Sequence, residues 1–388
     1  MKLRFTLLSA VLAVFALLTA CATPVTPPAP ELPNVPALPD LEPGVWTAFA
    51  PAGETICSDG SPYLYYVYPG TVNKVVVDFE GGGACWNGAT CAEGSGAYQP
   101  SIPDPEGRLE GVSGIYDKAN PDNPVGDWHH VFVSYCTADV HLGDSVQTYD
   151  TADGERTVNH NGQNNVDAVL SWVEREFSAP EAVLVTGCSA GAYGAALYTP
   201  RIAEAYPDAD VTQLGDCGAG IIPDSFAVGE DGLNRWNIGA VLPEGVDVTE
   251  GVPAAFLADA YVAIGRAHPE VTLKQYNSLL DNVQIMFYAL QLGLDPADPE
   301  VQKVAAEVWV TGLSASLQKI RAGLPGGFSS YTSLLDNDAS LQNGTLHCVI
   351  DRPEFYTLTT GNVPFVTWLN ELLNGDAPPA PVAPPTPG

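Results

Sequence analysis

The sequence predicts an α/β fold in which helices cover both faces of a mostly parallel sheet. Three observations carry this prediction. Short apolar runs typical of buried strands alternate with longer segments of helical periodicity. Hydrophobic residues make up 46% of the 388-residue chain, enough for a sizeable core in one domain. A serine also lies among glycines where one of these strands gives way to a helix.

The expected elements follow from their apolar patterns. Strands are expected at residues 64–68, 74–79, 131–135, 183–186, 211–214, 271–276 and 329–335. Helices are expected at residues 166–177, 190–205, 256–264, 282–292, 299–322 and 364–373. The helix at 166–177, for example, repeats valine and leucine at three- and four-residue spacing, which gathers them on one face. The irregular stretch 221–252 predicts a lid-like insert within the single domain.

The N-terminal residues 1–20 have the pattern of a signal peptide. Lys2 and Arg4 precede an apolar run that ends at Leu18. This run is shorter than the about 20 apolar residues that span a bilayer. Small residues before Cys21 resemble a bacterial lipobox, so we expect cleavage before Cys21 and lipidation of its sulfur. An ordinary signal peptide is the alternative, and both place the mature protein outside the cytoplasm; the favoured form is a membrane-anchored lipoprotein of the bacterial cell envelope.

Proline-rich segments flank the expected catalytic domain at residues 45–375. Residues 22–43 hold eight prolines, which favour an extended polyproline II conformation. We therefore expect residues 21–44 to form a linker behind the lipid anchor. Six prolines lie between residues 376 and 388, which predicts a disordered C-terminal tail.

Charge and cysteine usage narrow the range of functions. The formal net charge is −31, from 15 basic and 46 acidic residues. This argues against a nucleic-acid partner, because such binding needs basic contacts to phosphate, and mildly against polyanionic substrates. Lipidation of Cys21 leaves seven of the eight cysteines, so at least one thiol stays free. The chain has no C-x-x-C pair, and we predict neither a metal site nor another cofactor.

The serine that opens the argument about function is Ser189, in Gly187-Cys188-Ser189-Ala190-Gly191. This G-x-S-x-G pattern joins the expected strand at 183–186 to the expected helix at 190–205. In an α/β-hydrolase the nucleophilic serine occupies such a strand-to-helix turn, and the crowded backbone requires small residues two positions away on each side. Ser189 is therefore the candidate nucleophile. The alternative is a glycine-rich packing turn with an idle serine.

The order of residues along the chain selects a base and an acid. In this fold the serine is followed by an aspartate or glutamate and then by a histidine. Four histidines precede Ser189, and His268 precedes a strand, which leaves His347 as the candidate base. Asp281 follows the strand at 271–276 and is the leading acid. Asp216, after the strand at 211–214, competes with it, and Asp224 is a third candidate.

A glycine-rich segment after the strand at 74–79 supplies candidate oxyanion donors. It reads Phe79-Glu80-Gly81-Gly82-Gly83-Ala84-Cys85-Trp86. Glycines let the backbone approach a ligand closely. We expect the amides of Gly82, Gly83 and Ala190 to stabilise an oxyanion. Trp86 is a candidate to stack on a sugar or acyl group, and a packed core tryptophan is the equal alternative.

Several motifs taken together resemble the pectin acetylesterase family, which also contains the Notum lipid-removing carboxylesterases. They lie at residues 55–62, 79–86, 134–143, 187–191 and 346–348, within a resemblance that spans about residues 55–350. The resemblance implies an α/β-hydrolase fold, ester hydrolysis without a metal, and a Ser-Asp-His triad. The acid of the family lies in a segment that residues 275–284 match loosely, which favours Asp281.

The resemblance also implies disulfides and shows departures. It implies a local partner for Cys85 at Cys91, and bridges Cys57–Cys136 or Cys188–Cys217. Gly83 stands where many members have tryptophan, so the oxyanion loop is expected to be more open, and Asn282 replaces the glutamate after the acid. The lid region matches nothing that can be placed.

The expected function is hydrolysis of O-acetyl or short O-acyl esters, with an acetylated glycan as the favoured substrate. Short-chain esters of a lipid or polymer, including depolymerisation, are the runner-up. An inactive glycan-binding surface lipoprotein is the alternative from another class.

Overall fold

The computed structural model describes residues 36–103, 107–228, 232–246, 256–334, 346–374 and 382. The predicted signal peptide and Cys21 lie outside these residues. Residues 33–388 form one compact unit. The described end of the predicted linker packs on this unit, since the Leu38 amide donates to the Glu176 carboxylate at 2.8 Å. The folded body therefore begins before residue 45.

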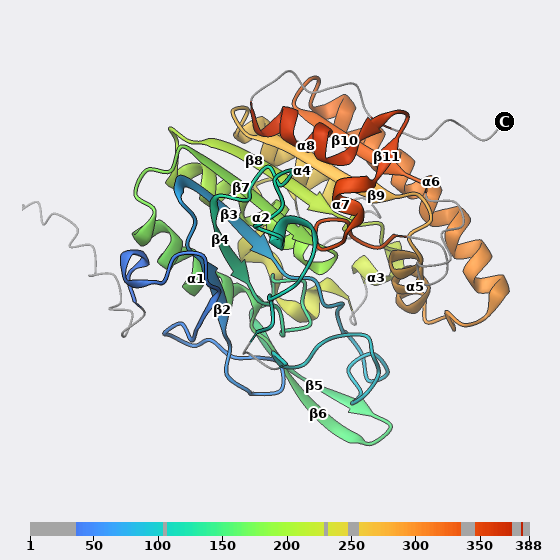
Figure 1. Ribbon diagram of the computed structural model, residues 1–388. Helices are drawn as coiled ribbons and strands as arrows, with labels where there is room; N and C mark the ends of the chain where they lie inside the picture. Colours follow the sequence, from blue (N-terminus) through green and yellow to red (C-terminus); the bar gives the residue numbers. More distant parts are fainter. Residues whose placement is uncertain are drawn as a thin grey trace, which may run out of the picture. The chain divides into compact units, whose positions relative to one another are not determined.

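Eight described strands form the central sheet in the order β1-β2-β4-β3-β7-β8-β9-β10 (Figure 1). Their bounds are β1 Thr47–Phe49, β2 Tyr65–Tyr68, β3 Val72–Phe79, β4 Trp128–Val133, β7 Ala182–Cys188, β8 Asp210–Asp216, β9 Thr272–Ser278 and β10 Phe328–Ser333. Pairing is parallel from β4 through β10 and antiparallel at the β1–β2 and β2–β4 contacts. The predicted mostly parallel sheet is confirmed, with β1 as an addition.

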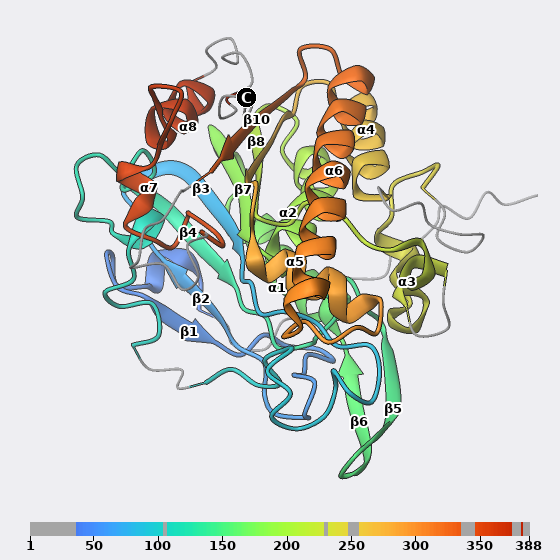
Figure 2. The ribbon, with the colours of Figure 1, turned by 90° about the vertical axis from the view of Figure 1, so that its right-hand side faces the viewer.

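Helices lie on both faces of the sheet, but unequally (Figure 2). One face carries α1 Gly162–Glu176, α2 Ala190–Ala205, α4 Phe256–Ala267 and α6 Pro299–Gly323. The other face carries the shorter α7 Glu354–Thr357 and α8 Phe365–Leu373. Successive side chains of a strand point to opposite faces of the sheet. In β3, Val75 and Val77 therefore pack in the core under the longer helices, and Val76 packs in the core under α7 and α8. The helix α5 Asn282–Gln291 follows β9.

A hairpin of β5 Ser145–Thr151 and β6 Gly154–His160 projects from the body outside the central sheet (Figures 1 and 2). The sequence did not indicate it, because its strands are polar on both sides and lack an apolar run. The described part of the lid-like insert consists of short helices. These are α3 Asp224–Val228, η3 Leu233–Trp236 and η4 Ile238–Val241.

The remaining short elements and the tail complete the body. They are η1 Leu38–Asp40, η2 Gly114–Tyr116, β11 Thr359–Thr360 and β12 Val363–Pro364. Within the predicted disordered tail the structure describes Val382 alone. It extends the sheet beyond β10: the Thr332 amide donates to its carbonyl at 2.8 Å, and its own amide donates to the Ser330 carbonyl at 3.1 Å. The proline-rich composition did not predict this pairing.

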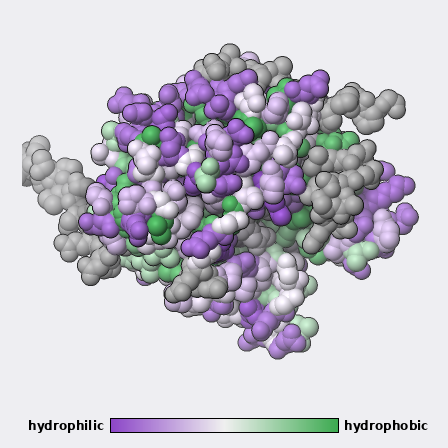
Figure 3. Space-filling model, viewed as in Figure 1, coloured by the Kyte–Doolittle hydropathy of each residue, from purple (hydrophilic) through white to green (hydrophobic). Residues whose placement is uncertain are grey.

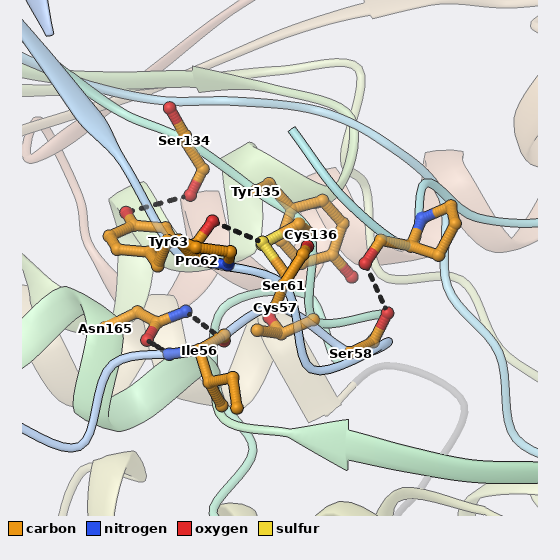
Figure 4. The surroundings of a disulfide bond; sticks show 12 residues. Ile56, Cys57, Ser58, Ser61, Pro62, Tyr63, Ser134, Tyr135, Cys136 and Asn165 are labelled. Atoms are coloured by element: carbon orange, nitrogen blue, oxygen red, sulfur yellow. Dashed lines mark hydrogen bonds between the residues drawn. A yellow bond between two sulfur atoms is a disulfide. The ribbon is translucent and has the colours of Figure 1, made fainter. Parts of the chain in front are cut away.

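The disulfides are Cys57–Cys136, Cys85–Cys91 and Cys188–Cys348. The first two confirm the pairings that the family resemblance implied, and Figure 4 shows the surroundings of Cys57–Cys136. The suggested Cys188–Cys217 bridge is wrong. Cys188 instead pairs with Cys348, and the thiol of Cys217 is free and buried.

The surface of the described residues fits a protein with high net charge. Figure 3 shows that one face is mostly hydrophilic, with scattered small hydrophobic areas. No helix in the described ranges has both the length and the apolar character needed to cross a bilayer.

Candidate active site

Ser189 occupies a tight turn between strand β7 and helix α2. Its backbone has φ 57° and ψ −117°, a strained conformation for a residue other than glycine. A Cβ on Gly187 would lie 2.4 Å from the carbonyl oxygen of Gly191, and one on Gly191 would lie 1.8 Å from that of Phe79. Larger residues at either position therefore cannot fit this backbone. The turn has the steric form that the G-x-S-x-G pattern predicted.

His347 and Asp281 form a hydrogen-bonded pair. The Nδ1 atom of His347 lies 2.9 Å and 3.0 Å from the two carboxylate oxygens of Asp281. Asp281 lies between β9 and α5, is fully buried, and caps α5 by accepting the amides of Val283 and Gln284 at 3.0 Å. The Gln284 side chain donates a further bond at 2.9 Å. The carboxylate thus has donors on several sides and a fixed orientation.

The electrostatics of this pair favour the imidazolium–carboxylate form. Burial alone would raise the pKa of Asp281, but the charge of His347 and the donated hydrogen bonds lower that pKa below its usual value. Burial alone would lower the pKa of His347, but Asp281 raises it above its usual value. Asp281 therefore stabilises a proton on His347 and favours the tautomer with hydrogen on Nδ1.

Ser189 and His347 face the same two cavities. No hydrogen bond between their side chains is present in the described part of the chain. Hydrogen bonds of this kind are often long without substrate and tighten in the Michaelis complex. The structure thus brings the candidate nucleophile and base to one site.

The residues that carry the candidate oxyanion donors line the two cavities beside Ser189. Gly82 and Gly83 line the larger cavity, and Gly83 and Ala190 line the smaller one. Within the described residues, the amides of these three have no hydrogen-bond partner, as expected for donors kept for a ligand. A Cβ on Gly83 would lie 2.0 Å from the Ala97 carbonyl oxygen, and its φ is 72°. This position therefore requires glycine.

Two residues that sequence reasoning did not single out hold the glycine segment in place. The Tyr135 hydroxyl donates to the Gly83 carbonyl at 2.9 Å and accepts the Val140 amide at 2.7 Å. His141 Nε2 lies 2.8 Å from the Glu80 carbonyl oxygen. Both belong to the motif at 134–143, so the motif was visible although its role was not.

Glu80 links this support to the larger cavity. Its carboxylate accepts the Tyr135 amide at 2.8 Å and pairs with Arg108. Burial raises the pKa of Glu80 to about 7, although Arg108 and the Tyr135 bond act against this shift. These contacts hold Glu80, near the start of the glycine segment, against Tyr135 and Arg108.

The competing acids lie elsewhere. Asp216, at the end of β8, directs its carboxylate to the Val349 and Ile350 amides at 2.8 and 2.9 Å and not to the imidazole ring. Burial raises its pKa to about 7. Asp224 is exposed at the start of α3. Of the three candidate acids, only Asp281 bonds the ring of His347 within the described residues.

Trp86 is mainly a packing residue. It is 2% exposed, and its ring centre lies 5.1 Å from that of Phe226 and 6.3 Å from that of Phe287. It also forms part of the wall of the smaller cavity. Its reach toward a ligand is therefore confined to that wall.

The two cavities differ in size and lining. The smaller, of about 70 Å³, is mostly apolar; its lining includes Ala190, Tyr193, Ile221, Ile222, Phe287 and Trp309. The larger, of about 680 Å³, is more polar; its lining includes Glu80, Gly82, Tyr98, Gln99, Arg108 and Asp351. Ser189 and His347 line both cavities.

The cysteines near His347 do not form a good metal site. Cys188 and Cys348 lie near its ring but are bonded to each other. Ligand atoms of Cys217, Asp281 and His347 lie within 4.8 Å of one another. Burial raises the pKa of the Cys217 thiol well above its usual value, which disfavours the thiolate that binds metals. The donor set suits a hydrogen-bonded acid–base pair better than an ion.

Comparisons with known proteins find similarity over part of this chain. Residues 47–228 match the family model of pectinacetylesterases. Pectin acetylesterases 11 and 7 of Arabidopsis thaliana are each 28% identical over 176 residues, 44% of this chain and 44% of theirs. The match thus spans less than half the length of these relatives. The matched family segment includes Ser189 and the glycine segment but ends before Asp281 and His347.

A solved structure extends the likeness over the sheet. The Wnt deacylase Notum from Drosophila superposes with a TM-score of 0.54 at 17% identity, covering 82% of this chain and 90% of that one. At this identity the likeness shows the fold, which is α/β-hydrolase-like. The comparisons therefore show that residues 47–228 are similar to pectinacetylesterases and that this chain shares its fold with Notum.

Proposed function

We propose that the protein is a serine carboxylesterase that removes O-acetyl or other short O-acyl groups from a glycan. The observation that carries the proposal is the convergence of Ser189, on its strained turn, and the His347–Asp281 pair on one site. The family match adds support, since the matched relatives are named pectin acetylesterases.

The proposed mechanism gives each residue of the site one role. His347 takes the proton of Ser189 as Oγ attacks the ester carbonyl, and Asp281 stabilises the resulting imidazolium. The Gly82, Gly83 and Ala190 amides bind the oxyanion, and each such donor is typically worth about 10²–10³ in rate. His347 then protonates the departing alcohol. Water, activated by the same histidine, releases the acyl group from Ser189. None of these steps calls for a cofactor.

The two cavities support a proposal for where the two sides of the ester bind. A single water molecule needs roughly 10–15 Å³ of cavity volume. The smaller cavity, of about 70 Å³, therefore has room for roughly five groups the size of a water molecule or a methyl group. Its apolar lining suits an acetyl or butyryl group. The larger cavity then receives the alcohol, because it has room for a sugar and a more polar lining than the smaller cavity.

Charge in the larger cavity favours a neutral glycan. Arg108 is the one permanent cation among the described residues that line it, and Arg108 is paired with Glu80. Asp351 adds a further acidic group. A polygalacturonate chain would place carboxylates here without free cations to receive them, so acetylated neutral polymers such as xylan are the favoured class.

We further propose that the protein works outside the cytoplasm, attached to the bacterial envelope through a lipid on Cys21. Three disulfides fit an oxidising compartment. Serine substitution at Cys21 should release the protein from membrane fractions without lowering its specific activity.

The decisive test compares wild type with Ser189→Ala on p-nitrophenyl acetate. We expect loss of turnover, and loss of fluorophosphonate labelling, in the variant. Ser314→Ala, at an exposed serine on α6, is the matched control and should behave as wild type. Equal activity of wild type and Ser189→Ala would overturn the proposal.

Further assays separate the rivals. Acetate release from acetylated xylan should exceed that from acetylated pectin, and acetyl esters should react faster than octanoyl esters. A preference for octanoyl esters would favour the lipid or polyester alternative. A wild-type protein that binds glycans but does not label with fluorophosphonate would favour the inactive binding lipoprotein.

A further inference from the structure

Asp216 bonds to both halves of the candidate active site. Its backbone carbonyl accepts the Ser189 amide at 2.7 Å. Its side-chain Oδ2 atom accepts the Val349 amide at 2.8 Å and the Ile350 amide at 2.9 Å. Asp216 is fully buried at the end of β8, directly beside Cys188 in the sheet register. One residue thus joins the nucleophile to the segment that follows His347.

A covalent bond makes the same connection. The disulfide Cys188–Cys348 joins the residue before Ser189 to the residue after His347, across 160 positions of sequence. The chain also turns sharply at Cys348, where φ is 63°. The backbone on the C-terminal side of His347 is therefore attached to the nucleophile turn twice, once through Asp216 and once through sulfur.

This double attachment fixes the position of the backbone that carries His347, which the contact with Asp281 does not do. Asp281 fixes the Nδ1 side of the imidazole, but the position of Nε2 relative to Ser189 also depends on the backbone that carries the ring. A misplacement of about 1 Å can cost about 10²-fold in rate. Two attachments to the turn of Ser189 keep the base in register with its nucleophile.

We propose that Asp216 is a positioning residue which acts with the Cys188–Cys348 disulfide as a clamp that holds His347 against Ser189. The inference rests on the proposed function, since it concerns the same serine and histidine. The clamp touches neither substrate nor oxyanion, so its loss should lower kcat and leave KM nearly unchanged.

The test uses three variants of the full chain. Asp216→Ala removes the acceptor of both amides and should lower kcat on p-nitrophenyl acetate by roughly 10- to 100-fold, with KM changed less than about threefold. Asp216→Asn keeps an oxygen that can accept both amides and should recover most of that loss. The double variant Cys188→Ala/Cys348→Ala removes the disulfide, which is the second attachment of the clamp. It should also lower kcat and leave KM nearly unchanged.

Combining Asp216→Ala with the double cysteine variant tests whether the Asp216 hydrogen bonds and the disulfide hold the same segment. If both hold the same segment, the combined loss in kcat is smaller than the product of the separate losses. A combined loss in kcat that equals the product of the separate losses, within error, would show independent effects and overturn the clamp. Unchanged kcat in the cysteine variant overturns it even where Asp216→Ala does not fold.

Two controls keep the interpretation clean. Cys57→Ala/Cys136→Ala also removes a long-range disulfide and should lower thermal stability with little change in kcat. A selective fall in kcat that this control shares would overturn the clamp. Ser189→Ala, measured alongside, separates the two ideas: if it stays active, the proposed function fails. If it is inactive while the clamp variants keep full kcat, only the clamp fails.

Discussion

The carboxylate of Asp281 lies 2.9 Å from Nδ1 of His347 and caps helix α5 at the same time. One side chain thereby orients the proposed base and completes the first turn of a helix. The amides that it accepts also stabilise its charge, which lets a fully buried carboxylate stay ionised beside the imidazole.

Replacement of Asp281 by asparagine should therefore separate these two roles. The amide side chain can still cap the helix but cannot stabilise an imidazolium, so we expect kcat to fall by about 10³–10⁴-fold with little loss of stability. Asp298→Asn is the matched control: Asp298 caps α6 through the Glu300 amide at 2.9 Å. Steady-state kinetics and thermal unfolding of both variants check this. A fall in kcat of less than about tenfold for Asp281→Asn would contradict the assigned role.

The pKa shifts of the pair predict the pH dependence of activity. His347 acts as a base only when neutral, and its pKa is raised above the ordinary 6.5. We therefore expect kcat/KM to fall as the pH drops through a value above 6.5. A profile measured from about pH 5 to 9 gives that value. An acid limb centred below 6.5 would be inconsistent with His347 paired to Asp281.

The same pair predicts an opposite trend in stability. A raised histidine pKa stabilises the fold below 6.5 and loses that contribution as the pH rises through the folded-state value. A lowered aspartate pKa stabilises the fold above 3.8 and loses that contribution as the pH falls through its folded-state value. The pair therefore stabilises most between these limits, where His347 is protonated and the proposed activity is low. Asp281→Asn should remove this pH-dependent part from the unfolding curves.

Tyr135 should matter for rate beyond its effect on stability. Tyr135→Phe removes the hydroxyl that holds Gly83 and Val140, so the glycine segment loosens and kcat should fall on the order of tenfold. Tyr63→Phe is the control, because Tyr63 is also buried and donates to the Ser134 carbonyl at 3.0 Å (Figure 4). Both variants should lose similar stability, by about 1 kcal/mol. Equal kcat values in the two variants would argue against the support role.

Ile221 should limit the length of the acyl group. It lines the smaller cavity, so Ile221→Ala enlarges the space next to Ser189. We expect the ratio of butyryl to acetyl kcat/KM to rise by about tenfold. Leu317→Ala makes a comparable cavity in the core away from this wall and should leave the ratio unchanged. A ratio that does not move with Ile221→Ala would place the acyl group elsewhere.

Local patterns in the sequence predicted most of the fold and the candidate residues of the site. The seven expected strands and six expected helices correspond to observed elements, because apolar periodicity reports burial directly. Ser189 carried its own turn signal, and His347 followed from its order among the strands. Chain order left Asp281 in competition with Asp216, and the family resemblance favoured Asp281. The polar hairpin of β5 and β6 was missed because neither strand has a buried face along its length.

No local pattern in the sequence indicated the residues that support the site. Asp216 accepts hydrogen bonds from amides 133 and 134 positions away. Because these donors are backbone groups, which nearly every residue has, the identities of the residues do not reveal the contact. The partner of Cys188 could not be chosen from spacing alone, because cysteine positions along a chain do not say which sulfurs meet in space. Long-range contacts to backbone groups require the assembled fold.

The bond between Cys188 and Cys348 closes the chain segment from residue 188 to residue 348 into a covalent ring. A protease that cuts one peptide bond within this ring yields two fragments that cannot diffuse apart. Ser189 and His347 then stay tethered through sulfur, so a nicked molecule can keep its proposed catalytic residues together until a reductant separates the pieces.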